Sequence, residues 1–144
     1  DAGGLKYLDL NKGYDNLVIT PHIKELSGLL DTDVLDVSTD PVKYLRELAK
    51  KGIITLLKGT TSIVQEQRYT YLLQAKNNGL ATAGTGDVLA GVISAFLVEE
   101  STVNACCKGL AVFMKAADFA RKRRGEVSMI ASDVVDNLYK VWSR

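Results

Sequence analysis

Residues 84–87 read Gly-Thr-Gly-Asp, and an apolar helix pattern follows directly from Val88. A small-residue turn that opens a helix leaves backbone N–H groups without intrahelical partners, at the positive end of the helix dipole. Glycines let an anion approach that backbone closely, so the run suits a phosphate. Asp87 falls in the first helical turn, where its carboxylate could act as a base beside a phosphoryl group. Taken alone, such a short motif is more often an ordinary turn with a helix-end charge.

Two further loops carry residues that could contact a ligand. Thr20-Pro21-His22 follows an apolar run at 17–20, and Lys58-Gly59-Thr60-Thr61-Ser62 follows another at 53–57. In parallel α/β sheets, ligands bind outside the carboxyl ends of the strands. We therefore expect these two loops and the 84–87 turn to converge on one crevice.

The loop after residue 57 offers several groups to a nucleotide. The Lys58 ammonium could bind a phosphate, Gly59 would give access to the backbone, and three hydroxyls could donate hydrogen bonds: Thr60, Thr61 and Ser62. Taken singly, a Lys-Gly pair at a strand end is more often a solvated charge and a turn. His22 alone is more often a histidine at a helix start, and Glu25 fits a capping box as well as a ligand contact.

The hydrophobic pattern predicts an α/β chain. The runs 17–20 and 53–57 are apolar throughout, which favours strands covered on both faces and paired in parallel. Residues 61–65 and 69–74 alternate as in a hairpin. We expect a mainly parallel sheet flanked by helices, with this small hairpin added.

Helix signals fill the rest of the chain. Asp40 fits an N-cap with Pro41 at the first helical position, and that helix is expected to end at Gly52. Three helices are expected at about 85–98, 102–123 and 131–142, with Ser132-Asp133 capping the last one. The basic run 121–124 comes just before Gly125, where cations complement a helix C-terminus.

Composition limits the possible functions. The 144 residues are 47% hydrophobic and 24% charged, as in one soluble globular domain spanning 1–144. The net charge of +1 gives no reason to expect a nucleic-acid or membrane partner. Cys106 and Cys107 are adjacent without metal-site spacing, so we expect reduced thiols in a cytoplasmic protein.

Together these residues resemble a known family, the ADP/ATP-dependent NAD(P)H-hydrate dehydratases of the ribokinase-like superfamily. The resemblance rests on Thr20-Pro21-His22-x-x-Glu25, Leu57-Lys58-Gly59 and the run from Asn77 to Gly91. The opening Asp1-Ala2-x-x-Leu5 and Ala131-Ser132-Asp133 also suit the family pattern. The chain departs from it at Gly3, at Ile23-Lys24 and at Phe113. Only the C-terminal half of the ribokinase-like domain is matched.

The resemblance implies a role for each candidate residue. Asp87 would be the catalytic base, and it would bind the hydrated nicotinamide together with His22. The N–H groups of Gly84, Thr85 and Gly86 would form an anion hole for the transferred phosphoryl group. The nucleotide, ADP or ATP, would be contacted by Gly86 and by Lys58, Gly59, Thr60, Thr61 and Ser62. Mg²⁺ is expected with the nucleotide, although the sequence shows no dedicated carboxylate cage for it, because Mg²⁺ often keeps water and substrate phosphates as ligands.

The function implied is a lyase reaction in nicotinamide nucleotide repair. Hydrated NADH or NADPH would be phosphorylated on its ring hydroxyl and would then lose phosphate to return NAD(P)H. Two alternatives stay open: a small-molecule kinase of the same superfamily, and a non-catalytic nucleotide-binding or assembly module. The chain starts at Asp1 rather than Met, which leaves three interpretations open: a fragment, a processed product or a truncated chain. Because half of the family domain is missing and the two apolar strands need neighbours, we expect the chain to be inactive alone and to need a complementary N-terminal half. A homo-oligomer is also expected.

Overall fold

A four-stranded sheet organises the first of two compact units, Asp1–Gln74. Its strands follow chain order: β1 (Leu17–Ile19), β2 (Ile53–Leu57), β3 (Thr61–Gln65) and β4 (Thr70–Gln74). The computed structural model describes residues 1–15, 17–74 and 77–142. β1 and β2 pair in parallel, with Leu17 opposite Ile53, because the long connection between them allows a crossover. This parallel pairing confirms the expectation from the two apolar runs.

The sheet is mixed, so the prediction of a mainly parallel sheet is wrong. β3 pairs antiparallel with β2, and β4 pairs antiparallel with β3. Only three residues separate β2 from β3, which is too short for a crossover connection, so the chain must return antiparallel. The predicted hairpin is confirmed, with its second strand starting one residue later than expected.

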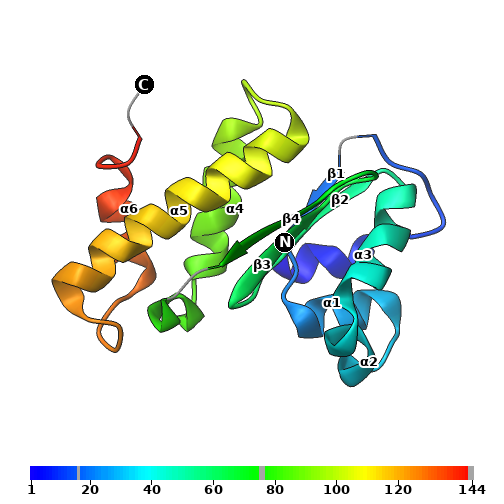
Figure 1. The fold of residues 1–144 in the computed structure, drawn as a ribbon, viewed down its shortest axis with the longest axis horizontal. Helices are drawn as coiled ribbons and strands as arrows, with labels where there is room; N and C mark the ends of the chain where they lie inside the picture. The colour runs from blue at the N-terminus through cyan, green and yellow to red at the C-terminus, as the bar shows by residue number, and fades with distance from the viewer. Residues whose placement is uncertain (16, 75–76, 143–144) are drawn as a thin grey trace. The chain divides into compact units, whose positions relative to one another are not determined.

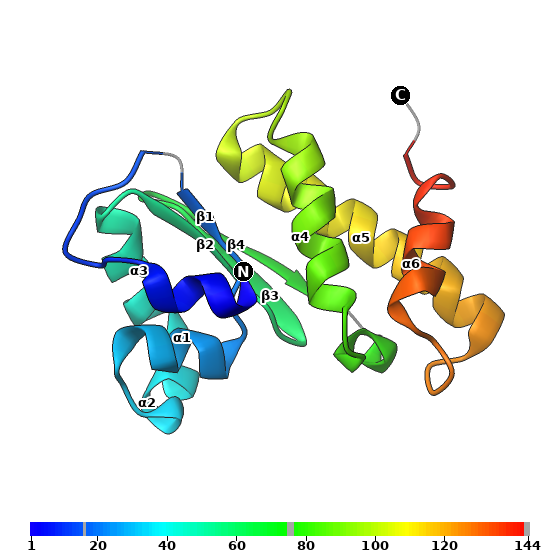
Figure 2. The ribbon, with the colours of Figure 1, turned by 180° about the vertical axis from the view of Figure 1, so that it is seen from behind.

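Three helices pack on one face of this sheet (Figure 1). They are α1 (Ile23–Leu30), α2 (Val34–Thr39) and α3 (Pro41–Lys50). Leu26, Leu45 and Leu48 bury their side chains with Ile53 and Leu57 of β2 in the core. A 3₁₀ helix, η1 (Ala2–Tyr7), contacts α1 (Figure 2).

Side-chain caps explain where two of these helices begin. Asp40 Oδ1 accepts a hydrogen bond from Lys43 N–H at 3.2 Å, with Pro41 at the first helical position, as predicted. That helix ends at Lys50, two residues before the expected Gly52. Asp33 Oδ1 accepts from Leu35 N–H at 2.7 Å and starts α2. The Asp33 cap thus adds a short helix between α1 and α3.

The second unit, Ala75–Arg144, is helical. It contains the 3₁₀ helix η2 (Asn78–Ala81) followed by α4 (Thr85–Phe96), α5 (Thr102–Arg124) and α6 (Ala131–Leu138). α5 packs against both α4 and α6. The three predicted helices are confirmed, although α6 ends four residues early. α5 ends one residue later than expected, with Arg121 to Arg124 in its last turn and Gly125 at φ 80° after it.

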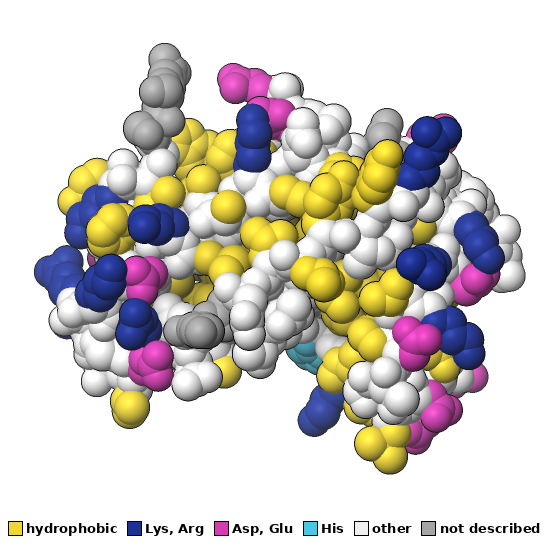
Figure 3. Space-filling model, in the orientation of Figure 1, with side chains coloured by type: hydrophobic (Ala, Val, Ile, Leu, Met, Phe, Trp, Pro, Cys, Tyr) yellow, Lys and Arg dark blue, Asp and Glu magenta, His cyan; other side chains and the backbone are white. Residues whose placement is uncertain are grey.

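Exposed apolar side chains gather on β4. Leu72 is 64% exposed and Tyr69, just before the strand, is 60% exposed. Figure 3 shows hydrophobic side chains over this strand. Within the described ranges, β4 pairs with β3 alone and so forms an edge of the sheet. Among the helices that the structure describes, none has the length and apolar character needed to cross a bilayer.

Candidate functional site

Two of the three predicted ligand loops are neighbours at the carboxyl ends of β1 and β2. Lys58 N–H donates to the Pro21 carbonyl at 2.8 Å, and His22 and Lys58 form a parallel bridge beyond the strands. The parallel pairing of β1 and β2 therefore continues into both loops. The expected convergence is confirmed for these two loops.

His22 is the N-cap of α1. Its Nδ1 accepts a hydrogen bond from Glu25 N–H at 3.1 Å, while Glu25 Oε2 accepts from His22 N–H at 2.8 Å. This reciprocal pair is a capping box, so Glu25 has the capping role that the sequence left open. The His22 side chain is 51% exposed, so its ring remains accessible to a ligand.

The Lys58 ammonium lies between two carboxylates. Its Nζ is 2.9 Å from Asp1 Oδ1 and 3.5 Å from Glu25 Oε2. The Lys58 side chain is only 20% exposed, so it is not the freely solvated charge that a Lys-Gly pair usually provides. A nucleotide phosphate would compete with Asp1 and Glu25 for this cation. Sequence reasoning missed both partners, because Asp1 and Glu25 are both distant from Lys58 in the chain.

The residues after Lys58 divide into buried and accessible groups. Ser62 is buried, and its hydroxyl donates to the Gly59 carbonyl at 3.4 Å. A Cβ at Gly59 would lie 3.3 Å from the Thr61 carbonyl oxygen, so this turn favours glycine. Thr60 and Thr61 are exposed, and their hydroxyls can reach a ligand. Ser62 therefore shapes the turn that presents Thr60 and Thr61.

The Gly-Thr-Gly-Asp turn opens α4 as the sequence predicts. Gly84 is the N-cap at φ 84°, ψ −13°, a left-handed conformation that glycine adopts without strain. No side chain caps this helix, and Asp87 is exposed in its first turn. The Thr85 N–H donates to the Thr82 carbonyl at 3.3 Å. The N–H groups of Gly86 and Asp87 are therefore better placed than that of Thr85 to receive an anion.

Side chains from three segments hold this turn in place. The Thr85 hydroxyl lies 2.7 Å from the Leu80 carbonyl and 2.8 Å from the Thr82 carbonyl. The Thr82 hydroxyl donates to the Met129 carbonyl at 3.3 Å. A Cβ at Gly84 would lie 3.3 Å from Ala131 Cβ, at the start of α6. The sequence predicts only that the Thr85 N–H binds an anion. In the structure the Thr85 hydroxyl also holds the turn in place through these two hydrogen bonds.

Asp133 stabilises the start of α6 beside this turn. Its Oδ2 accepts from Ile130 N–H at 3.0 Å, and its Oδ1 accepts from Arg124 Nε at 2.9 Å. The backbone hydrogen bond, and then the Arg124 guanidinium, hold the pKa of this carboxyl below its usual value. The sequence predicted that Ser132 or Asp133 would cap α6, and Asp133 supplies this capping hydrogen bond, to the Ile130 N–H.

The third loop belongs to the second unit, so its meeting with the other two loops stays a prediction. Within residues 1–15, 17–74 and 77–142, no group of three or more His, Cys, Asp or Glu side chains could hold a metal ion. Burial raises the pKa of the Cys106 thiol to about 12, as expected of a core cysteine that stays protonated.

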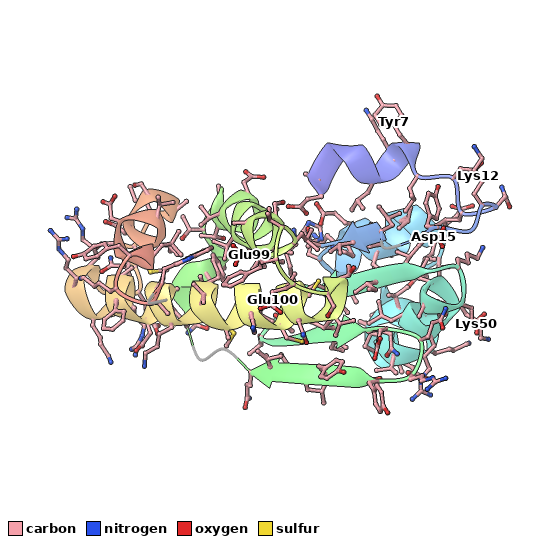
Figure 4. The ribbon with its side chains drawn as sticks, turned by 90° about the horizontal axis from the view of Figure 1, so that it is seen from above. Tyr7, Lys12, Asp15, Lys50, Glu99 and Glu100 are labelled. Atoms are coloured by element: carbon pink, nitrogen blue, oxygen red, sulfur yellow. The ribbon has the colours of Figure 1, made fainter. Side chains whose placement is uncertain are left out.

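A depression of about 530 Å³ lies elsewhere in the first unit. Its lining includes Tyr14, Asp15, Gly52 and Glu66. Asp15 precedes β1 and lies at the amino end of the strand (Figure 4). The predicted site residues of the first unit lie in the loops at the carboxyl ends of β1 and β2 instead. This depression is therefore separate from the candidate site.

Comparison with known proteins identifies relatives over nearly the whole chain. A model of the NAD(P)H-hydrate dehydratase family matches residues 1–140. A bifunctional NAD(P)H-hydrate repair enzyme of Vibrio cholerae is 33% identical over 141 residues, which cover 96% of this chain and 28% of that protein. An ADP-dependent (S)-NAD(P)H-hydrate dehydratase of Neisseria meningitidis is 37% identical over 120 residues, covering 81% of this chain and 40% of that one. The chain thus spans less than half the length of these relatives.

Solved structures share the fold. The ADP/ATP-dependent NAD(P)H-hydrate dehydratase of Bacillus subtilis, co-crystallized with ATP and Mg²⁺ and soaked with CoA, matches with a TM-score of 0.79 and 24% identity. The match covers 87% of this chain and 47% of that one. A ribokinase-like superfamily protein of Enterococcus faecalis matches with a TM-score of 0.77, 24% identity, and coverage of 90% of this chain and 46% of that one. The predicted α/β, ribokinase-like fold is confirmed, over about half of the domain found in these structures.

Proposed function

This chain belongs to the NAD(P)H-hydrate dehydratase family, and we propose that the complete protein dehydrates hydrated NADH or NADPH at the expense of ADP or ATP. The observation that carries the proposal is the start of α4. There, an uncapped helix N-terminus and the exposed Asp87 carboxylate occupy the same turn. Backbone donors and a base are the two groups that phosphorylation of a hydroxyl requires.

Asp87 begins the reaction by accepting the proton of the ring hydroxyl. The hydroxyl oxygen then forms a bond to the terminal phosphorus of the nucleotide, and the bond from that phosphorus to the bridging oxygen breaks. The N–H groups of Gly86 and Asp87 stabilise the negative charge on the transferred group, and Gly84 with Thr85 shapes the turn that aims them.

Elimination of phosphate completes the dehydration. The carbon–oxygen bond of the phosphorylated ring breaks, with its electrons leaving on phosphate. A proton leaves the adjacent ring carbon, and the ring double bond of NAD(P)H forms again. The net change is loss of water from the substrate and hydrolysis of one phosphoanhydride bond. His22, with its half-exposed ring, binds the substrate during both steps.

The nucleotide is bound by the loop after β2. Its contacts are the backbone at Lys58 and Gly59, the exposed hydroxyls of Thr60 and Thr61, and the turn that Ser62 holds. The Lys58 ammonium also binds the nucleotide phosphate, for which the phosphate must displace the Asp1 or the Glu25 carboxylate from it. Mg²⁺, when bound, neutralises phosphate charge and keeps phosphate oxygens and water as its ligands. We place the enzyme in the cytoplasm, as a homo-oligomer.

An assay of the complete protein tests the proposal. Hydrated NADH is supplied with Mg²⁺ and either ADP or ATP, while NADH absorbance and released phosphate are recorded together. We expect one phosphate to be released for each NADH formed. A stable phosphorylated ring without phosphate release would identify a small-molecule kinase. Nucleotide binding without either product would identify a binding module.

A further inference from the structure

The hydrogen bond that His22 makes as an N-cap determines which of its ring nitrogens carries a proton. Glu25 N–H donates to Nδ1 at 3.1 Å, so this nitrogen uses its lone pair as an acceptor. An imidazole nitrogen that accepts a hydrogen bond has no proton of its own. In the neutral ring the proton therefore resides on Nε2.

The surroundings of Nε2 favour the same arrangement. Glu25 Oε1 lies 3.7 Å from Nε2, which is too long for a hydrogen bond, but its negative charge favours the tautomer whose N–H dipole points toward it. The other oxygen, Oε2, accepts from His22 N–H and lies 3.5 Å from Lys58 Nζ. The Glu25 carboxylate thus contacts both the backbone N–H and the ring of His22, and it cannot rotate away without losing these contacts.

We propose that Glu25 and the start of α1 fix His22 as its Nε2–H tautomer, so that His22 donates a hydrogen bond to its ligand rather than removing a proton from it. The ligand group that suits this donor is a carbonyl or phosphate oxygen, such as the carboxamide oxygen of a nicotinamide. Glu25 is then a positioning residue. The ligand identity rests on the proposed function, whereas the tautomer does not.

The tautomer is measured directly by long-range ¹H–¹⁵N correlation spectra of the full chain labelled with ¹⁵N-histidine. His22 is the only histidine among the 144 residues. At a pH where imidazole is neutral, we expect one tautomer with the proton on Nε2. Glu25→Ala keeps the backbone N–H that donates to Nδ1 but removes the carboxylate beside Nε2 and one half of the capping box. We therefore expect its ring signals to shift toward the averaged values while the proton on Nε2 remains the major form. Glu47→Ala removes an exposed glutamate that pairs with Lys50 and is the matched control, with an unchanged His22 spectrum.

A second variant tests the donor role. His22→Asn keeps a side-chain oxygen that accepts from Glu25 N–H, so α1 stays capped, but it lacks the Nε2–H group. We expect the affinity for NADH, the product of the proposed reaction, to fall about tenfold, the usual effect of one lost hydrogen bond. Unchanged NADH affinity in His22→Asn, or an averaged tautomer in the wild type, would overturn the proposal. Absence of dehydratase turnover beside a fixed Nε2–H tautomer would contradict the proposed function alone.

Discussion

Gly109 of α5 lies so close to Ile93 of α4 that a methyl group at Gly109 would come within 2.9 Å of Ile93 Cγ1 and 3.1 Å of Ile93 Cα. The two helices can approach this closely only because residue 109 has no side chain. The contact positions α4, whose first turn carries Asp87.

Gly109→Ala should therefore destabilise the protein by about 1–3 kcal/mol, the usual cost of overpacking a core. Gly91→Ala is the matched control on α4, because nothing lies within 4 Å of its added methyl group. It should stabilise the protein by about 0.5–1 kcal/mol, since alanine favours a helix interior more than glycine does. Urea unfolding measures the free energy of unfolding of both variants. Equal changes in the two variants would contradict the close contact between Gly109 and Ile93.

Asp87→Asn should lower turnover about 10²- to 10⁴-fold while leaving nucleotide affinity nearly unchanged. The amide keeps the shape of the side chain but cannot accept the hydroxyl proton. Turnover of hydrated NADH and the dissociation constant of ADP are measured side by side in the complete protein. Asp136→Asn, an exposed change on α6, is the control and should retain activity. Full activity in Asp87→Asn would remove Asp87 from the mechanism.

Lys58→Met should destabilise the fold by about 1–3 kcal/mol, because it leaves the Asp1 and Glu25 carboxylates partly buried without their shared cation. Lys50→Met serves for comparison, since Lys50 is 70% exposed and pairs with Glu47 on the surface. Its effect should be within about 1 kcal/mol of zero. Thermal unfolding of the two variants checks this difference.

Lys58→Ala should also weaken the binding of ADP and ATP, and the loss should shrink as salt is added. Charges near the surface are screened over a Debye length of ~8 Å at physiological ionic strength. Isothermal titration at low and high salt measures the effect. If Lys58 pairs with Asp1 and Glu25 but does not contact the nucleotide, the affinity of Lys58→Ala for ADP and ATP at low salt will equal that of the wild type.

Asp133 should make stability depend on pH in the acid range. Because its pKa is lowered in the fold, its contribution is full above the unfolded value near 3.8. That contribution is lost as the pH falls through the lower folded pKa. Asp133→Asn should therefore lower Tm at neutral pH, and its difference from wild type should narrow below about pH 4. The pH dependence of Tm for both proteins tests this.

The sequence predicted the features that follow from local pattern. The apolar runs before Pro21 and Lys58 indicated paired parallel strands, and Asp40-Pro41 marked a helix start that the structure confirms. It could not predict the partners of Lys58, because Asp1 is brought to Lys58 only by the folded chain. The mixed sheet was missed for a similar reason. The apolar sequence of β2 indicates that both faces of the strand are buried. It does not indicate whether the neighbouring strand β3 runs parallel or antiparallel to it.

The hydrogen bond from Lys58 N–H to the Pro21 carbonyl has a consequence for amide hydrogen exchange. Lys58 follows the last residue of β2, yet its amide proton is enclosed between two loops and should exchange with deuterium only when they separate. The exchange rate of this single proton thus reports how often the His22 and Lys58 loops open. A nucleotide that bridges the two loops would slow that exchange, whereas one that contacts residues 60–62 alone would leave it unchanged.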